Sequence, residues 1–250
     1  MYPLVDTHAH LDEIENLEVA LENARQHGVV AIIAMGSDLR SNERVLELAE
    51  RFRGYIFPAL GLHPWTLVEG SAEVRATLRF IEENLDQAVA LGEVGLDYQK
   101  GLVSQVGKEL QKEILAQVLE LARKSEKPAS IHSRYAWRDC FTVVRESGVK
   151  KAVFHWYTGP IKVLREILAE GYLASATPAL AYHEEHRRAV KEAPLSQLVL
   201  ETDSPVAYRG HRAEPSDVIR VLQLVAELKK LDPNAVAEAT TNNAREVFGL

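Results

Sequence analysis

The sequence predicts an α/β protein, a (β/α)8 TIM barrel that spans residues 1–250 as one domain. Short apolar runs alternate with longer amphipathic stretches along the whole chain, which gives eight strand–helix units. Such alternation is typical of a parallel sheet covered by helices, and eight units at this length favour a closed barrel. The alternative is an open, doubly wound sheet, which usually has a Gly-rich phosphate loop after its first strand. Here the first strand leads into His8-Ala9-His10, and no such loop follows.

The expected strands are short apolar runs. Their ranges are 4–6, 29–35, 56–62, 88–91, 129–131, 152–154, 172–176 and 198–200.

A helix is expected after each strand, from the spacing of apolar residues and from capping residues at the ends. In residues 17–27 the apolar residues recur at helical spacing, and Gly28 ends the helix. Ser41 and Ser71 are expected as N-caps, and Pro160 as the first residue of its helix. The ranges are 17–27, 41–52, 71–84, 107–125, 137–147, 160–171, 184–193, 214–231, and two more helices from residue 232 onward, the last at 241–248.

Composition and net charge indicate which classes of protein and of binding partner the sequence allows. Hydrophobic residues make up 46% of the chain and charged residues 26%, an ordinary globular mixture. The formal net charge of −7 argues against a broad cationic surface for duplex DNA, but it allows nucleic acid to be held locally at a metal site. No apolar run is long enough to span a membrane, and the N-terminus lacks the features of a signal peptide. Cys140 is the only cysteine, which excludes an internal disulfide, so we expect a cytoplasmic protein. No obligate protein partner is evident from the sequence.

Polar side chains stand at the C-terminal ends of the expected strands, where the active sites of such barrels lie. Along the first strand Asp6, His8 and His10 alternate, so their side chains share one face. Four histidines and two carboxylates that converge on one mouth suit two divalent metal ions. Glu93 is the best-placed bridge, because a carboxylate has two oxygens whereas a neutral imidazole offers one lone pair. The residues at strand ends are His8, His10, His63, Glu93, His132, Arg134, His155, Trp156, Tyr157, Glu201 and Asp203, and strand 172–176 carries none.

The remaining histidines are expected to play other parts. His63 is at the same mouth but precedes a proline, so we expect it beside the metals or on the substrate. Those in predicted helices or loops are not expected as ligands: His27, His183, His186 and His211.

Taken together, the motifs resemble those of the TatD-like metal-dependent deoxyribonucleases, a branch of the amidohydrolase-like barrels. Any one motif is weak, whereas the set is highly specific and runs through essentially the whole chain in the family's order. The matching stretches are VDTHAHLD at 5–12, GLHP at 61–64, GEVGLDY at 92–98, IHSR at 131–134, HWYTG at 155–159, LETDSP at 200–205, RGHRAEP at 209–215 and ATTNNA at 239–244. The resemblance implies a barrel of the metal-dependent hydrolase type.

The resemblance also implies a ligand set for two divalent ions. It assigns the first ion to His8, His10, Glu93 and Asp203, the second to Glu93, His132 and His155, and roles near the metals to His63 and Glu201. The identity of the ions stays open among Mg, Mn, Zn and Co. The sequence departs from the family at the mouth of the site, which bears on the substrate rather than on the metals. Tyr135 stands where the family often has Asp, and Trp156-Tyr157 where it often has a small residue and Phe.

We interpret the chain as a deoxyribonuclease that cleaves phosphodiester bonds at single-stranded or frayed DNA ends. Asp203 is expected as the general base, and Glu93, His63 and Glu201 complete the expected catalytic group. Candidates for phosphate contacts are Arg134, Arg209 and Arg212, with solvated loop charges as the alternative for the last two. Candidates for stacking on bases are Trp65, Tyr98, Trp156 and Tyr157, with core or lid packing as the alternative.

Two other functions stay open from the sequence. The first is hydrolysis of a cyclic amide, a lactone, a phosphotriester or an aminoacyl ester, because barrels of this kind host many chemistries. The second is a metal-stabilised binding protein without catalysis, against which the intact ligand positions and Glu201 argue.

Overall fold

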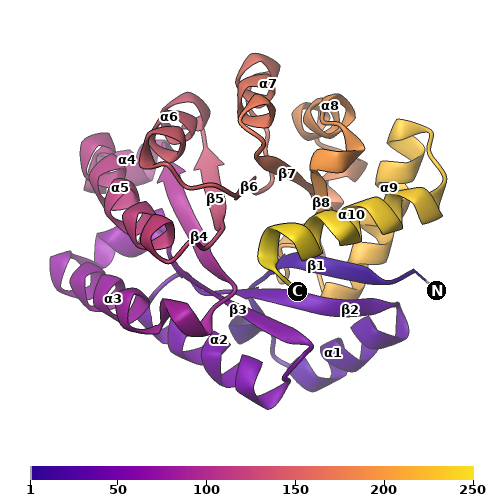
Figure 1. Cartoon of the computed structure of the whole chain (residues 1–250), viewed down its shortest axis with the longest axis horizontal. Helices are drawn as coiled ribbons and strands as arrows, with labels where there is room; N and C mark the ends of the chain where they lie inside the picture. The colour runs from indigo at the N-terminus through magenta and orange to yellow at the C-terminus, as the bar shows by residue number, and fades with distance from the viewer. Residues whose placement is uncertain (1) are drawn as a thin grey trace.

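The computed structural model describes residues 2–250, and its eight main strands form a (β/α)8 barrel, as the sequence predicts (Figure 1). The strands follow one another around the sheet in sequence order, and each pairs with the next in parallel. They are β1 (Leu4–Ala9), β2 (Val29–Met35), β3 (Ile56–Leu62), β4 (Ala90–Asp97), β5 (Ala129–Arg134), β6 (Ala152–Phe154), β7 (Leu173–Ala176) and β8 (Leu198–Leu200).

The first and last strands close the barrel through the chain that follows each of them. Ala9 and Ser204 form a parallel bridge, and the backbone N–H of His10 donates to the carbonyl oxygen of Ser204 at 2.7 Å. The N–H of Asp203 donates to the carbonyl oxygen of His8 at 2.9 Å. Closure therefore brings the end of β1 and the segment that follows β8 together at the mouth of the barrel.

Helices surround the sheet on the outside (Figure 1). Among residues 2–250, no helix is both long and apolar enough to cross a membrane. The α-helices are α1 (Leu17–Gln26), α2 (Leu39–Arg51), α3 (Ser71–Asn84), α4 (Lys100–Val106), α5 (Lys108–Lys124), α6 (Trp137–Ser147), α7 (Ile161–Ala169), α8 (Glu184–Glu192), α9 (Val218–Lys229) and α10 (Pro233–Phe248). Short 3-10 turns are η1 (Leu11–Glu13), η2 (Pro64–Glu69), η3 (Leu85–Gln87), η4 (Pro178–Ala181), η5 (Leu195–Gln197) and η6 (Pro215–Asp217).

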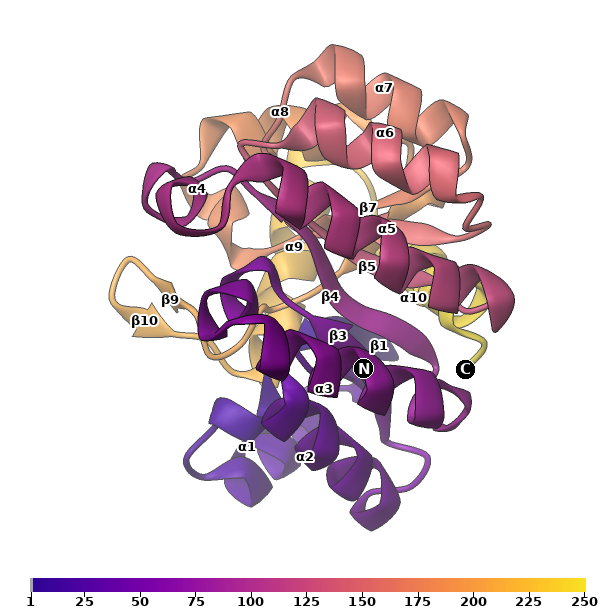
Figure 2. The same ribbon diagram turned by 90° about the vertical axis from the view of Figure 1, so that its left-hand side faces the viewer.

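The two ends of the barrel differ. Helix α10 closes the end at which the strands begin: Val247 and Phe248 pack against Val5, Ile33 and Val199 of the strands. At the other end, a small hairpin of β9 (Ala207–Tyr208) and β10 (His211–Arg212) projects from the body, on the same side as α4 (Figure 2). Because these apolar side chains fill the end of the barrel where the strands begin, a site can open at the C-terminal ends of the strands.

Strand β4 is longer than predicted, and the reason lies in its glycines. The sequence predicts a strand over residues 88–91. Glycine is generally depleted in strands. Here, however, the glycines allow neighbouring backbones to approach. A Cβ atom on Gly95 would lie 1.9 Å from the carbonyl oxygen of His132, and one on Gly92 would lie 2.5 Å from that of Ala59. The strand therefore runs on past Glu93 to Asp97.

Other elements differ in their ends. Asp38, not Ser41, caps α2: its side chain accepts from the backbone N–H of Ser41 at 2.7 Å, and the Ser41 hydroxyl accepts from the N–H of Asp38 at 3.0 Å. Gly70 precedes α3, so Ser71 is its first residue rather than its cap. Helix α4 was not expected, and the two helices expected after residue 232 are one, α10, capped by Asp232.

Candidate metal centre and active site

Four side chains converge at the mouth of the barrel, from β1, β4 and the loop after β8. The Nε2 atoms of His8 and His10 are 3.3 Å apart. Oε2 of Glu93 lies 3.5 Å from the first and 3.3 Å from the second. Oδ1 of Asp203 lies 3.6 Å from each. Two nitrogens and two oxygens thus surround one point.

The spacing of these four atoms matches what a divalent ion requires. Zinc binds imidazole nitrogen and carboxylate oxygen at about 2.0–2.2 Å, which sets tetrahedral ligands about 3.3–3.6 Å apart. The five distances given by the structure span 3.3–3.6 Å. The nitrogen and oxygen donors suit Zn, Mn or Co, or Mg with bound waters. The residues present therefore fit a divalent ion at this point.

A second group surrounds the other oxygen of Glu93. Its Oε1 accepts from Nδ1 of His132 at 2.8 Å, and Nε2 of His63 is 3.6 Å away. Nε2 of His155 lies 3.9 Å from this oxygen and 3.7 Å from Oδ2 of Asp203. This group is less regular than the first, because the His132–Glu93 pair is in direct contact. It can hold an ion only if that pair separates slightly.

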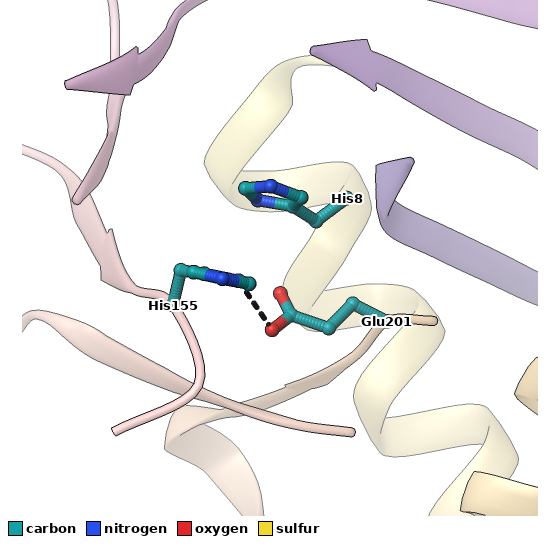
Figure 3. A group of neighbouring side chains, drawn as sticks. All are labelled: His8, His155 and Glu201. Atoms are coloured by element: carbon teal, nitrogen blue, oxygen red, sulfur yellow. Dashed lines mark ion pairs between the residues drawn. The ribbon is translucent and has the colours of Figure 1, made fainter. Parts of the chain in front are cut away.

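The histidines are oriented through their other nitrogens. Nδ1 of His8 lies 3.3 Å from the hydroxyl of Ser130, and Nδ1 of His155 lies 2.6 Å from Oε1 of Glu201 (Figure 3). The rings of His8 and His155 are stacked, with centres 3.9 Å apart. Partners of this kind fix which nitrogen faces a metal, and they make the imidazole a stronger ligand. Glu201 thus acts behind the centre, through His155.

Ser175 on β7 supports Glu201 and was missed by the sequence analysis, which expected no site residue on that strand. Its hydroxyl donates to Oε1 of Glu201 at 2.6 Å and accepts from the backbone N–H of Trp156 at 2.8 Å. Trp156 has φ +37°, a conformation that is costly for a bulky residue. These bonds hold the chain in the sharp turn after His155. A serine in a strand of small residues carries no signal of this role.

Asp97 at the end of β4 was also missed. It is fully buried, and its Oδ2 lies 3.3 Å from Nε2 of His132. The same oxygen accepts from Nε1 of Trp65 at 2.8 Å and from Nε of Arg134 at 3.0 Å. The available signal was its spacing from Glu93, because residues i and i+4 of a strand lie on one face. The strand expected over residues 88–91 stops short of Asp97.

The two central carboxyl groups of the site, Glu93 and Asp203, have lowered pKa values. Burial alone would raise the pKa of each carboxyl group, but the nearby imidazoles outweigh it. With His63 as the strongest influence, they hold the pKa of Glu93 well below its usual range, and His155 likewise lowers that of Asp203. Burial lowers the pKa of His63 to about 3, whereas Glu201 and Asp203 overcome burial and raise that of His155 to about 9. Both central carboxylates are thus ionised at neutral pH.

A cavity of about 1230 Å³ opens over this centre. Arg134 is the one arginine or lysine among the residues that line it. Its aromatic walls are Trp65, Tyr135, Trp137 and Trp156, and its acidic residues outside the two clusters are Glu13, Asp38, Glu69, Glu73 and Glu185. The cavity therefore offers stacking surfaces and few positive charges.

The expected metal ligands lie together in the structure, but some residues expected to contact the substrate do not line the cavity. The Tyr98 hydroxyl donates to Asp139 at 2.8 Å, outside the cavity lining. Tyr157 is only 1% exposed, and its hydroxyl donates to the carbonyl oxygen of Pro160 at 2.9 Å. These two tyrosines are packing residues, so the expectation that they stack on bases has to be corrected.

Two arginines expected at the substrate also lie outside the cavity lining. The guanidinium of Arg209 lies 4.6 Å from the ring centre of Tyr182. Arg212 donates to the carbonyl oxygen of Glu13 at 3.2 Å and pairs with Glu15 at 3.7 Å. Both belong to the β9–β10 hairpin region, which projects from the body of the barrel (Figure 2).

The chain is similar in sequence and in structure to known proteins of one family. The family described as TatD related DNase matches residues 5–249. "Deoxyribonuclease TATDN3" of Homo sapiens is 32% identical over 98% of this chain and 94% of that protein. "Uncharacterized metal-dependent hydrolase YabD" of Bacillus subtilis is 32% identical over 99% of both chains. The crystal structure of YJJV, a TatD homologue from Escherichia coli, is 27% identical with a TM-score of 0.89, over 99% of this chain and 98% of that one.

Proposed function

Because the chain belongs to the TatD-related deoxyribonuclease family, we propose that this metal-dependent hydrolase cleaves phosphodiester bonds at single-stranded or frayed DNA ends with two divalent ions. The observation that carries the proposal is the placement of two ligand groups, joined by Glu93, at the floor of a cavity with aromatic walls. At about 1230 Å³ the cavity exceeds the roughly 300–1,000 Å³ of ordinary small-molecule pockets. It has room for the end of a strand.

Two ions would share Glu93. The first would be held by His8, His10, Glu93 and Asp203, and the second by Glu93, His132 and His155, with His63 beside it. Divalent ions bound there would lower the pKa of a water molecule and neutralise charge on the scissile phosphate.

The chain's own side chains would do the remaining work. Asp203 is ionised, and its Oδ2 faces His155 while its Oδ1 faces His8 and His10, so it can accept a proton from a water at the centre. Nε and Nη2 of Arg134 are engaged by Asp97 and Gln99, which leaves Nη1 as the donor for a phosphate of the substrate.

The preference for ends follows from charge. A duplex laid across the mouth would bring several phosphates against acidic side chains such as Glu69 and Glu73, with Arg134 as the only guanidinium in the lining. A strand end presents few phosphates, and the ions would neutralise the one that is cleaved. The same acidic rim is the observation that favours the second candidate, hydrolysis of an uncharged cyclic amide or lactone.

An assay of one protein against both substrate classes separates these candidates. Protein loaded with Mn²⁺, Zn²⁺, Co²⁺ or Mg²⁺ is given a single strand, a blunt duplex and a duplex with a frayed end, and in parallel a set of lactones, cyclic amides, phosphotriesters and aminoacyl esters. We expect cleavage of the single strand and the frayed duplex well above that of the blunt duplex. Turnover of a small ester or amide without cleavage of any DNA would overturn the nuclease proposal.

The number of ions is tested separately. Elemental analysis of metal-saturated protein, with anomalous scattering from its crystals, should give two ions per chain. A reproducible value of one, with His132 turned away from Glu93, would overturn the two-ion proposal.

A further inference from the structure

Trp65 is unusual on the cavity wall, because its indole is exposed and yet firmly held. It lies in η2, and 53% of its surface is exposed. Its Nε1–H donates to Oδ2 of Asp97 at 2.8 Å, and its backbone N–H donates to Nδ1 of His63 at 3.1 Å. A side chain already fixed in this way loses little further conformational freedom when a ligand stacks on it. The open indole is therefore preorganised for a flat partner.

Asp97 links this indole to two other groups. Its Oδ2 also accepts from Arg134 and lies 3.3 Å from Nε2 of His132. The Arg134 guanidinium lies 5.2 Å from the centre of the Trp65 ring. Oδ1 of Asp97 accepts from the backbone N–H of Gln99 at 2.8 Å, so the carboxylate itself cannot turn freely. One buried carboxylate thus fixes an aromatic surface, a guanidinium and an imidazole of the candidate metal centre.

This arrangement lies directly beside the expected point of cleavage. The ring of His63 stands edge-on to that of Trp65, with centres 5.1 Å apart. Nε2 of the same histidine lies 3.6 Å from Oε1 of Glu93. A single side chain, that of His63, therefore separates the indole from the candidate metal centre.

We propose, building on the nuclease function proposed above, that Trp65 and Arg134 form a subsite for one unpaired nucleotide next to the scissile phosphate. Trp65 stacks on the base and Arg134 binds a phosphate, while Asp97 is the positioning residue that holds both. Inside a duplex, neighbouring bases cover both faces of each base, so only a terminal or unpaired base can present a face to an aromatic ring. The subsite supplies a physical reason for acting on single-stranded or frayed ends.

The test measures binding as a function of both the side chain and the base. The parent is metal-loaded Asp203→Asn protein, which is expected to cleave the substrate about 10²–10⁴ times more slowly. Binding of short labelled single strands is followed by fluorescence anisotropy within the time before cleavage. In one strand every nucleotide carries its base, and in two others an abasic residue replaces the nucleotide on one or the other side of the cleaved phosphate. Trp65→Ala and Trp65→Phe are compared with Val68→Ala, an exposed residue of η2 outside the cavity lining.

Stacking of one base predicts that Trp65→Ala weakens binding of the intact strand by about 5- to 150-fold. The same change should alter binding of one of the abasic strands less than about twofold, because the base that it would contact is missing. Trp65→Phe keeps an aromatic face and should keep a measurable preference for the intact strand, and Val68→Ala should match the parent.

Equal weakening of the intact strand and both abasic strands by Trp65→Ala would overturn the subsite, and so would Trp65→Phe protein without any preference. Both outcomes differ from failure of the nuclease function itself. In that case protein with Asp203 intact would cleave no DNA, whatever the residue at position 65.

Discussion

Acidification should destabilise the protein through the buried imidazole of His186 on α8. The ring is fully buried between the loops that follow β6 and β7. Its Nδ1–H donates to the carbonyl oxygen of Tyr157 at 3.0 Å, and its Nε2 accepts from the backbone N–H of Thr177 at 3.1 Å. The second bond requires the neutral ring, because a protonated Nε2 has no lone pair with which to accept, and burial lowers the pKa of His186 to about 4.

The sign and the size of the effect follow from that pKa. The unfolded chain takes up this proton near pH 6.5 and the folded protein near pH 4, so between these values the unfolded state binds more protons. Stability is therefore complete above pH 6.5 and falls as the pH is lowered. The loss attributable to His186 is about 2 kcal/mol at pH 5 and about 3 kcal/mol at pH 4.

The assay compares His186→Gln with the unchanged protein by urea unfolding at pH 7, 6 and 5. Glutamine can both donate and accept but does not titrate. The variant should be less stable at pH 7, and its deficit should shrink by about 2 kcal/mol at pH 5. Taking the difference removes the contributions of titrating groups shared by both proteins. A deficit that stays constant with pH would refute the argument.

Three further changes test the centre and the substrate. Asp203→Asn should fold, as judged by circular dichroism, but lose about 10²–10⁴ in kcat at saturating metal, and retention of most of the rate would exclude Asp203 as the base. Glu201→Gln removes the anionic partner of His155 and should weaken metal binding about 10- to 100-fold by calorimetry, whereas unchanged affinity would mean that the pair in Figure 3 does not support the ligand. In a salt series, the logarithm of the affinity for a short single strand should fall with the logarithm of the salt concentration. The slope should be about −0.7 if Arg134 alone contacts a phosphate and about −2 if Arg209 and Arg212 also do. A slope as steep as that of proteins with many phosphate contacts would contradict an acidic cavity.

The fold was predictable because its signal is repeated. Each strand of a closed parallel barrel is covered by a helix, so the alternation of apolar runs and amphipathic stretches is imposed eight times over. Ends of elements were less predictable, because they depend on contacts distant in the sequence. Gly92 and Gly95 belong to a strand only because the backbones of Ala59 and His132 approach them.

The residues of the candidate metal centre could be predicted because several of them lie within strands. The outer substrate contacts could not, because they lie beyond the strand ends. Residues up to the end of a strand keep the alternation of the sheet, so His8, Glu93 and His132 point where the pattern says. Beyond the strand the alternation is lost. Positive φ at Trp156 turns the chain, and the next side chain, Tyr157, enters the core instead of the cavity.

Residues that support the metal ligands are still harder to predict from the sequence. Asp97 and Ser175 act on ligands rather than on a metal, and their importance depends on which atoms meet across strands. Composition does not reveal such contacts, and the one signal within a strand was the spacing of Asp97 from Glu93 on β4.

The closure of the barrel also sets an order in time. A ribosome makes the chain from its N-terminus, so His8 and His10 emerge early, whereas Asp203 is made only after four-fifths of the chain. The two histidines meet Asp203 through the junction of β1 with the segment after β8, where the N–H of Asp203 donates to the carbonyl oxygen of His8. A growing chain therefore cannot bring this group of four side chains together before Asp203 itself has been made, however early His8 and His10 leave the ribosome.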